Sequence, residues 1–357
     1  MWIKELNYTH FRNLQSNQLH LKPGISVFYG VNGQGKTNIL ESVYTLLTSR
    51  SFRTHNLIDC ISFGNKYMNI SGILMKKHMA WSMEFQYRNK GSARFINSKK
   101  EKTLDYLKVG SVLIFHAASK RIILGSPDDR RRLLDQLIGM GDSRYLSLLS
   151  QYRRNRQNLK KILLSHHPDR HLYKSFKQTL LPIACELITK RIEYIARIQP
   201  YFNSIYRDVF SENERVYLKY QIKNSVDRDS YEKRFIESSP KELLYKRQLM
   251  GPHLDDLLFY MNDSPSRKFS SSGQIRSMIL ALLCAARKKE FMENQLYPIF
   301  LLDDIRSELD QKRLSKLMHY LGDKGQILIS STKYAKIDHS CLSSGFEVKN
   351  GTIHPLG

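Results

Sequence analysis

The order of hydrophobic and polar residues in the first fifty positions predicts a strand, a glycine-rich turn and a helix. Apolar and polar residues alternate over residues 2–8, and a short β-rich run follows at Ile25–Tyr29. This run ends at Gly30. Beyond Lys36 the apolar residues recur at helical spacing, at Ile39, Leu40, Val43, Leu46 and Leu47.

Strand-like stretches continue toward residue 115 and return after residue 255. Runs at 67–74, 81–87 and 112–115 predict an antiparallel sheet beside the first unit. In the last third of the chain, helices are predicted at 277–287 and 312–321, and strands at 299–302 and 326–331.

Residues from about 120 to 250 have a helical pattern instead. Ser126 and Pro127 open one helix, with Asp129 at the capping-box position. Longer helices are predicted at 145–164 and 172–198, with breaks at 166–169 and at Pro200. We therefore predict an α/β domain formed by residues 1–119 and 251–357, with a helical, basic lobe of residues 120–250 inserted between its halves.

Charge narrows the choice of partner. Lys and Arg number 57 against 33 Asp and Glu, which gives a formal net charge of +24. This excess argues against an ordinary neutral metabolic enzyme and favours nucleic acid or an anionic membrane surface. The longest uninterrupted apolar run, Met278–Ala286, is too short to span a bilayer, and the first residues lack the layout of a secretory signal. We expect a cytoplasmic protein that does not enter the membrane.

The basic residues are concentrated between residues 120 and 161, where eleven Lys and Arg face four acids. Such a local excess suits neutralisation of phosphates without base-specific recognition. The candidate DNA-binding residues are Arg130, Arg131, Arg132, Arg153, Arg154, Arg156, Lys160 and Lys161. For any one of these Arg residues, a solvated helix face or an ion pair is an equally good interpretation. Tyr145, Tyr152 and Tyr173 are better explained by packing in a helix core than by stacking on bases.

One contiguous motif points to nucleotide chemistry. Residues Gly30, Val31, Asn32, Gly33, Gln34, Gly35, Lys36 and Thr37 match the P-loop pattern without a gap. Glycines allow successive backbone N–H groups to surround phosphates, and the start of the following helix adds a positive field. Lys36 would reach the β- and γ-phosphates of ATP, and the Thr37 hydroxyl would bind Mg²⁺.

Asp303 and Asp304 directly follow residues 299–302, whose consecutive apolar side chains predict a buried strand. Asp303 is the expected second ligand of Mg²⁺, directly or through water, and Asp304 is expected to orient or deprotonate the attacking water. The alternative is that these acids only cap the next helix. Residues 270–274, which precede a predicted helix, also have two interpretations. Its small residues form either an anion-accepting helix start or a plain serine-rich turn with a cap.

These elements in this order resemble the ATPase head of ATP-binding cassette proteins, and the resemblance narrows to the RecF family of SMC-like ATPases. The matching stretches cover residues 11 to 310: Phe11-Arg12-Asn13, Gly30 to Asn38, Gly125 to Asp135, Gly251 to Asp256, Ser271 to Arg276, and Leu302 to Asp310. The resemblance implies an ABC-type P-loop head with an inserted helical lobe, and it implies that ATP joins two copies of the chain. It adds Arg12, Ser271, Gly273, Gln274 and Asp310 to the nucleotide-binding set.

The resemblance also implies a function. Members of this family act as ATP-dependent DNA clamps at gapped or single-stranded/double-stranded junctions, with slow ATP hydrolysis. Together with RecO and RecR they assist RecA loading and support SOS induction. Several positions here depart from the family pattern, namely Leu254, Ser272, Ile275 and the pair His116-Ala117. These changes leave nucleotide binding intact. They bear on the rate of hydrolysis and on closure of the stretch 270–274, called the signature below, over the nucleotide of a second copy.

Two other classes of function compete with a DNA clamp. A transport or translation cassette would use the basic surface on RNA or a membrane partner, although such chains carry two P-loops and this one carries one. A structural SMC-type tether would need long coiled-coil arms. The helical middle allows arms of only about 40 Å at the rise of an α-helix, which is a stub.

Overall fold

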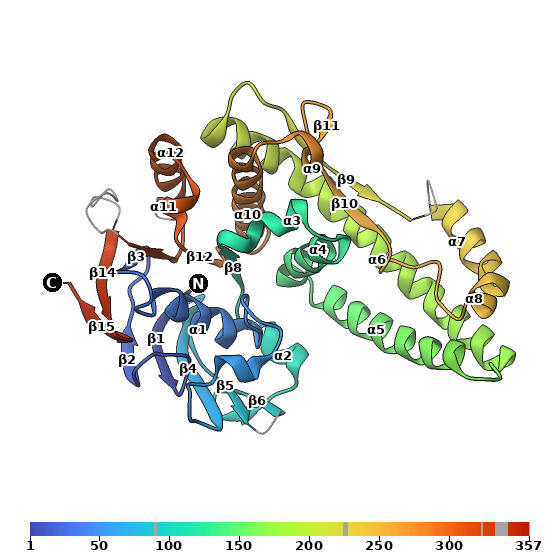
Figure 1. Cartoon of the computed structure of the whole chain (residues 1–357), viewed down its shortest axis with the longest axis horizontal. Helices are drawn as coiled ribbons and strands as arrows, with labels where there is room; N and C mark the ends of the chain where they lie inside the picture. The colour runs from blue at the N-terminus through green and yellow to red at the C-terminus, as the bar shows by residue number, and fades with distance from the viewer. Residues whose placement is uncertain (89–90, 224–227, 323, 333–341, 357) are drawn as a thin grey trace. The chain divides into compact units, whose positions relative to one another are not determined.

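The chain folds into two compact units, shown in Figure 1 for the computed structural model, which describes residues 1–88, 91–223, 228–322, 324–332 and 342–356. The first unit, called the head below, comprises Met1–Ser119, Asp208–Ser211 and Arg276–Gly357. The second, called the helical unit, comprises Lys120–Arg207 and Glu212–Ile275.

A six-stranded sheet in the order β15-β14-β3-β13-β12-β8 positions the head's functional residues. Its strands are β3 (Ile25–Tyr29), β8 (Val112–Phe115), β12 (Ile299–Leu302), β13 (Ile327–Ser331), β14 (Leu342–Lys349) and β15 (Thr352–Pro355). All pairings are parallel except that of β14 with β15. Because parallel strands end at one edge of a sheet, the residues that follow β3, β8, β12 and β13 lie near one another.

The second sheet of the head is antiparallel, in the order β2-β1-β4-β5-β6-β7. Its strands are β1 (Trp2–Thr9), β2 (Asn17–His20), β4 (Tyr67–Lys76), β5 (Met79–Arg88), β6 (Gly91–Ile96) and β7 (Lys99–Lys100). Buried and more exposed residues alternate along β4, as expected of a strand with one face toward the core.

Helix α1 (Lys36–Thr48) packs between the two sheets, against β13 and β8 on one side and β4 and β5 on the other (Figure 1). Its apolar residues are almost fully buried, so the helix that begins at the P-loop is also the centre of the head's core. The other helices of the head are α2 (Thr103–Leu107), α11 (Ile305–Glu308) and α12 (Gln311–Leu321), with 3₁₀ turns η1 (Leu57–Cys60) and η2 (Ala117–Lys120). Helix α10 (Ser272–Asn294) starts in the helical unit and continues in the head.

The helical unit combines long helices with a small antiparallel sheet. Its helices are α3 (Arg121–Leu124), α4 (Pro127–Gly141), α5 (Ser143–Leu164), α6 (Arg170–Ile205), α7 (Arg228–Glu237), α8 (Ser239–Tyr245) and α9 (Ser266–Phe269), and α6 runs into a π-helical turn, η3 (Tyr206–Phe210). The sheet is β11-β10-β9, with β9 (Val216–Gln221), β10 (Asp256–Met261) and β11 (Ser264–Pro265). Among the described residues, no helix is both long enough and apolar enough to cross a bilayer.

Three features differ from the sequence-based expectations. Strand β8 belongs to the parallel sheet, where it pairs with β12, and not to the antiparallel one. Its run of four consecutive apolar residues is typical of a strand covered on both faces. Pro200 does not end α6, because Ile198 and Phe202 continue the buried face, and this packing outweighs the lost helical hydrogen bond.

The second boundary between the units falls at 275/276 rather than at 250/251. Strand β10 pairs along its whole length with β9, so the segment after residue 251 folds with the helices that precede it. The first boundary, at 119/120, lies where the sequence pattern changes to helix.

Candidate nucleotide-binding site and nucleic-acid interface

The P-loop joins β3 to α1 and leaves an open cradle. Gly30 has φ 153° and lies so close to β14 that a Cβ there would be 2.4 Å from the carbonyl oxygen of Val348, which explains why glycine is required. Gly33 has φ 81°, and a Cβ added there would meet no atom within 4 Å. The tip of the loop is therefore free for a phosphate to approach the backbone. Val31, Asn32 and Gly33 are exposed, and Gly35 is the N-cap of α1.

Lys36 is held inside the loop. Its Nζ donates hydrogen bonds to the carbonyl oxygens of Gly30 (2.7 Å) and Val31 (2.8 Å). Burial lowers the pKa of Lys36, and the carboxylates of Asp304 and Asp303 oppose that shift. The ammonium group thus rests on neutral carbonyls within a partly desolvated loop, where a phosphate oxygen is a stronger acceptor.

Thr37 and Asp303 meet below the loop, as the motif spacing predicts. The Thr37 hydroxyl donates to Oδ1 of Asp303 at 2.8 Å, across 266 positions of sequence. Hydroxyl and carboxylate oxygens are ligands that Mg²⁺ prefers, so this pair fits a magnesium ion that also contacts a phosphate. Ser330 at the end of β13 donates a second hydrogen bond to Oδ1 of Asp303, at 2.6 Å.

Asp304 has an unusual backbone conformation next to this pair. Its φ of 48° lies in the left-handed region, and its N–H donates to Oγ of Ser330 at 2.8 Å. Asp304 is also the N-cap residue of α11, but its side chain makes no capping hydrogen bond there. The capping interpretation thus accounts for the position of Asp304 and leaves its carboxylate available for chemistry.

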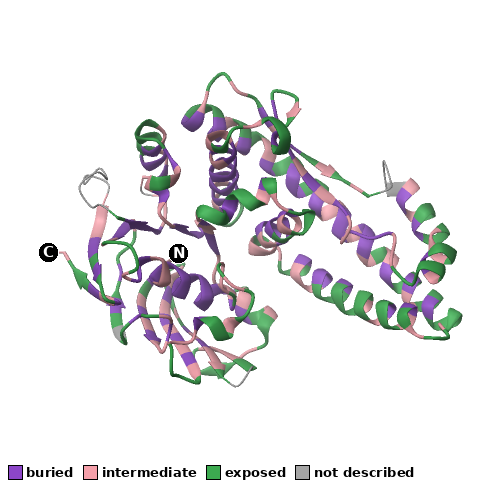
Figure 2. Cartoon of the chain, in the orientation of Figure 1, coloured by how far each residue is buried: buried purple, intermediate pink, exposed green. Residues whose placement is uncertain are grey.

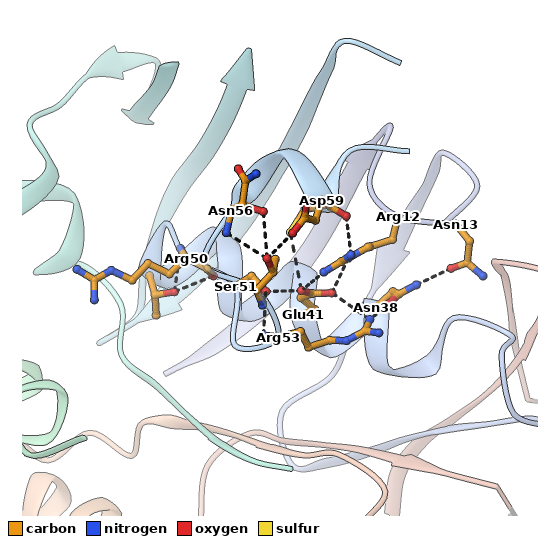
Figure 3. Close-up of polar contacts among 12 residues, drawn as sticks. Arg12, Asn13, Asn38, Glu41, Arg50, Ser51, Arg53, Asn56 and Asp59 are labelled. Atoms are coloured by element: carbon orange, nitrogen blue, oxygen red, sulfur yellow. Dashed lines mark hydrogen bonds and ion pairs between the residues drawn. The ribbon is translucent and has the colours of Figure 1, made fainter. Parts of the chain in front are cut away.

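Arg12 belongs to a polar network beneath the start of α1, shown in Figure 3. Its guanidinium forms a two-pronged ion pair with the buried carboxylate of Glu41, at 2.9 Å to Oε2 and 2.8 Å to Oε1. Arg53 approaches the same carboxylate at 3.4 Å and donates to Oδ1 of Asn38 at 2.7 Å. Because Asn38 follows Thr37 directly and also bonds Asn13 at 2.6 Å, the network joins the Arg12 segment to the P-loop helix.

His116 follows β8 at the same sheet edge. The register of β8 with β12 pairs Phe115 with Leu302, so His116 stands opposite Asp303. Its ring lies 5.0 Å from that of Phe52, measured between centroids. Burial lowers the pKa of His116, which keeps the imidazole neutral near neutral pH.

The signature stretch is locally capped. Ser271 and Gln274 form a reciprocal pair at the start of α10: the N–H of Ser271 donates to Oε1 of Gln274 at 2.7 Å, and the N–H of Gln274 donates to Oγ of Ser271 at 3.3 Å. Gly273 lies in the first turn and is half-buried. Asp310 caps α12 by accepting from the N–H of Arg313 at 2.9 Å, and its side chain remains 57% exposed.

The candidate DNA-binding residues fall into two groups. Arg130 is buried and forms a two-pronged ion pair with Asp256, at 2.6 and 2.8 Å, so it cannot contact a phosphate and leaves the candidate set. Arg131 donates to the carbonyl of Asp255 and pairs with Asp128, and its side chain is only 13% exposed. The remaining candidates are exposed: Arg132, Arg153, Arg154, Arg156, Lys160 and Lys161.

The exposed group lies mostly along α5, where Figure 2 shows a largely exposed helix. Arg153 is about half-exposed and reaches Asp135 at 3.3 Å. Tyr145, Tyr152 and Tyr173 are buried, which confirms their packing role and excludes them as a platform for bases. The helix thus has one apolar face in the core and one basic face in solvent.

Comparison with known proteins places the whole chain. The family model described as "RecF/RecN/SMC N terminal domain" matches residues 2–353. The chain is 32% identical to the DNA replication and repair protein RecF of Bacillus subtilis (strain 168) over 99% of this chain and 100% of that protein. The chain belongs to the RecF family. Another member, RecF of Streptococcus gordonii, is 32% identical over 99% of this chain and 100% of its own length.

Solved structures agree with this RecF assignment. A structure of the recombination mediator protein RecF with ATP, in the RecFOR pathway, has a TM-score of 0.91 and 26% identity, covering 100% of this chain and 98% of that chain. The Smc head domain of Pyrococcus furiosus, 15% identical and covering 99% of this chain and 96% of that chain, has a TM-score of 0.61 and shares the fold. The chain therefore has the ABC-type, SMC-like ATPase head fold.

Two of the positions that depart from the family pattern lie at the start of α10. Ile275 is 3% exposed and packs as a core residue of this helix. Ser272 is the first residue of α10 and is exposed.

Sequence analysis missed Ser330, Glu41 and Arg53. Ser330 had a usable signal, because parallel pairing of β13 with β12 places it beside Asp303. Glu41 and Arg53 had none, since an acid within a helix and an Arg in a loop are ordinary surface residues by pattern.

Proposed function

We propose that this protein is an ATP-dependent DNA-binding clamp of replication and recombinational repair. The observation that carries the proposal is the contact of Thr37 with Asp303 directly below an open P-loop cradle. These two oxygen atoms come from opposite ends of the chain, and their contact supports a shared role in binding a magnesium–triphosphate. The name carried by its relatives, DNA replication and repair protein, points to the same role.

ATP would be held chiefly by the head. The backbone N–H groups of residues 30–35 surround the phosphates, and Lys36 exchanges its carbonyl partners for phosphate oxygens. Thr37 and Asp303 would hold Mg²⁺, which would supply positive charge to offset that of the triphosphate. Asp304 would orient a water for slow, DNA-stimulated hydrolysis of ATP, and hydrolysis would reopen the clamp. Arg12 would contribute by holding Glu41, which in turn holds Arg53 against Asn38 near the start of α1, or by contacting the nucleotide directly.

Closure requires a second copy. Ser271, Gly273 and Gln274 of one subunit would meet the γ-phosphate held by the P-loop of the other, and Asp310 would contact the partner subunit. Since each subunit carries one P-loop and one signature, two copies form two equivalent sites. Nucleotide state would therefore set the lifetime of the dimer.

DNA would contact the basic face of the helical unit. Arg132, Arg153, Arg154, Arg156, Lys160 and Lys161 are exposed, and backbone contacts of this kind carry no sequence preference. Single-stranded, gapped or junction DNA is the expected target. The solved RecF structures are those of a recombination mediator of the RecFOR pathway, which supports RecO and RecR as partners. The family resemblance adds that these partners would assist RecA loading and support the SOS response. A cytoplasmic location fits these partners.

Binding to gapped DNA tests this function. Anisotropy titrations of labelled gapped duplex are made with ATP and Mg²⁺, with ADP, and without nucleotide, and RNA of equal length is the competitor. We expect ATP to tighten DNA binding and RNA to compete weakly. Equal affinity in all nucleotide states would overturn the ATP-gated clamp, and stronger competition by RNA would favour a cassette acting on RNA.

A further inference from the structure

Glu214 lies beside the signature stretch in the fold, although sixty positions separate it from Gln274. It sits in the loop between the π-helical turn η3 and strand β9. Its Oε1 accepts a hydrogen bond from Nε2 of Gln274 at 2.6 Å, and its Oε2 accepts one from the hydroxyl of Tyr206 at 2.6 Å. The carboxylate thus bridges the first residue of the π-helical turn and the start of α10.

This bridge fixes which way the Gln274 amide points. With Nε2 bound to Glu214, the amide oxygen Oε1 faces the N–H of Ser271 and accepts a hydrogen bond from it at 2.7 Å. The N–H of Gln274 in turn donates to Oγ of Ser271. A glutamine amide has an NH₂ group that donates and an oxygen that accepts. Because the anionic Glu214 binds the NH₂ group of Gln274, the amide oxygen is left facing Ser271, where it completes the capping pair.

The bridge is itself anchored. Tyr206 is fully buried, and its hydroxyl holds the second carboxylate oxygen of Glu214. A π-helical turn inside or at the end of an α-helix is an uncommon feature that is often found at functional sites. The chain of contacts runs from Tyr206 through Glu214 and Gln274 to Ser271.

We propose that Glu214 is a positioning residue for the signature, which holds Gln274 and Ser271 in the geometry that receives the γ-phosphate bound by a second copy of this chain. The inference rests on the proposed ATP-dependent dimerisation and names the residue that prepares its recognition surface. Without this carboxylate, the Gln274 amide keeps only its hydrogen bond with the N–H of Ser271 and loses the partner that selects its orientation, so part of the order must be restored at each closure. Closure then becomes weaker, while nucleotide binding by the P-loop of the same subunit is unaffected.

The experiment compares Glu214→Ala with Glu214→Gln, Tyr206→Phe and the matched control Glu212→Ala, which removes an exposed glutamate from the same loop. Sedimentation velocity with saturating ATP and Mg²⁺ gives the dimer dissociation constant of each full-length variant. A fluorescent ATP analogue gives nucleotide affinity at concentrations where the protein is monomeric, and thermal unfolding reports folding.

We expect Glu214→Ala to weaken dimerisation about tenfold, as for loss of a hydrogen bond to a charged group. Glu214→Gln keeps an acceptor for Gln274 and should therefore weaken dimerisation much less than Glu214→Ala does. Tyr206→Phe should have an intermediate effect on dimerisation. The nucleotide affinity of the Glu214 and Tyr206 variants should equal that of the wild type. Glu212→Ala should equal the wild type in both dimerisation and nucleotide affinity. A purely structural role would instead lower the unfolding temperature and nucleotide affinity together.

Two results would overturn the inference. Glu214→Ala dimerising as tightly as Glu212→Ala would show that the carboxylate positions nothing, and tighter dimerisation would show that it opposes closure. If wild type and Glu212→Ala both remain monomeric with ATP, the proposed function fails, and this inference falls with it.

Discussion

The two units use basic residues in different ways. In the head, Lys36, Arg12 and Arg53 are each held by specific oxygen acceptors around one site. In the helical unit, Arg191 is buried against Asp135 at 2.8 Å and Lys177 against Glu242 at 2.6 Å, whereas the charges of α5 face solvent.

Burial and pairing, rather than the number of charges, therefore separate the roles of the basic residues. Arg130 and Arg132 are two positions apart on α4, yet the first is locked in the interior and the second is exposed. A buried Arg with two-pronged pairing maintains the fold, and an exposed one is available to a phosphate. Four predictions test this division.

Lys36→Ala removes the charge that lies inside the P-loop and should give the largest change. We expect ATP affinity to fall about 1000-fold, because the variant has no desolvated ammonium group to bind the phosphates. Lys36→Arg should retain part of the affinity, since a guanidinium keeps the charge and presents donors of another shape. Titration with a fluorescent ATP analogue measures both. Wild-type affinity in Lys36→Ala would contradict the assignment of this site.

Glu41→Gln tests the ion pairs that Arg12 and Arg53 form with Glu41 in the head. Arg12 and Arg53 would lose their anionic partner in a buried position, so we expect the free energy of unfolding of the head to fall by about 3 kcal/mol. Urea unfolding measures it. The control is Glu347→Gln, an exposed glutamate of β14, which should change stability little. Equal effects of the two substitutions would mean that the network adds nothing to stability.

Neutralising the α5 face tests the helical unit. A quadruple variant carries Arg154→Gln, Arg156→Gln, Lys160→Gln and Lys161→Gln. It should bind DNA more weakly. The slope of log binding constant against log salt concentration should fall by about 0.9 for each phosphate that the protein no longer neutralises. The control replaces Lys66, Lys99, Lys100 and Lys102, four exposed lysines of the head, by Gln. An unchanged slope in the first variant, or the same reduction in both, would place DNA elsewhere.

His253 gives the smallest expected effect, through pH. Burial, followed by Arg156 and other nearby Arg residues, lowers the pKa of His253 to about 3, and its Nδ1 lies 2.6 Å from the hydroxyl of Tyr152. Because an unfolded histidine titrates near 6.5, stability is fully present above that pH and is lost as pH falls toward 3, by about 1.4 kcal/mol per unit.

Urea unfolding at several pH values between 7 and 5 measures this loss. His253→Gln should show a shallower dependence on pH than the wild type, and His20→Gln, which changes an exposed residue, should keep the wild-type slope. A wild-type slope in His253→Gln would mean that this imidazole does not titrate as its burial requires.

Contiguous motifs made the placement of the P-loop and Asp303 in the fold predictable. The P-loop, strand β12 and Asp303 are each defined by neighbours in sequence, and a strand–turn–helix pattern fixes how they are used. The inserted helical lobe was also predictable, since the hydrophobic spacing changes near residue 120.

Long-range contacts explain the rest. Arg130 pairs with Asp256 across 126 positions, and no local pattern announces that partner. Ser330 and Glu214 acquire their roles from strand register and loop position, respectively. Tertiary packing also overrode a local rule at Pro200, where the buried face of α6 continued past the proline.

Sedimentation velocity of the wild type and Ser271→Arg, with and without ATP and Mg²⁺, shows whether ATP joins two copies of the chain through the signature. We expect ATP to convert the wild type from monomer to dimer. Ser271→Arg should stay monomeric while binding the ATP analogue as tightly as the wild type, because its P-loop is intact. A wild type that remains monomeric at saturating ATP, or a Ser271→Arg variant that dimerises equally well, would contradict the claim that the signature of one copy closes on the nucleotide of another.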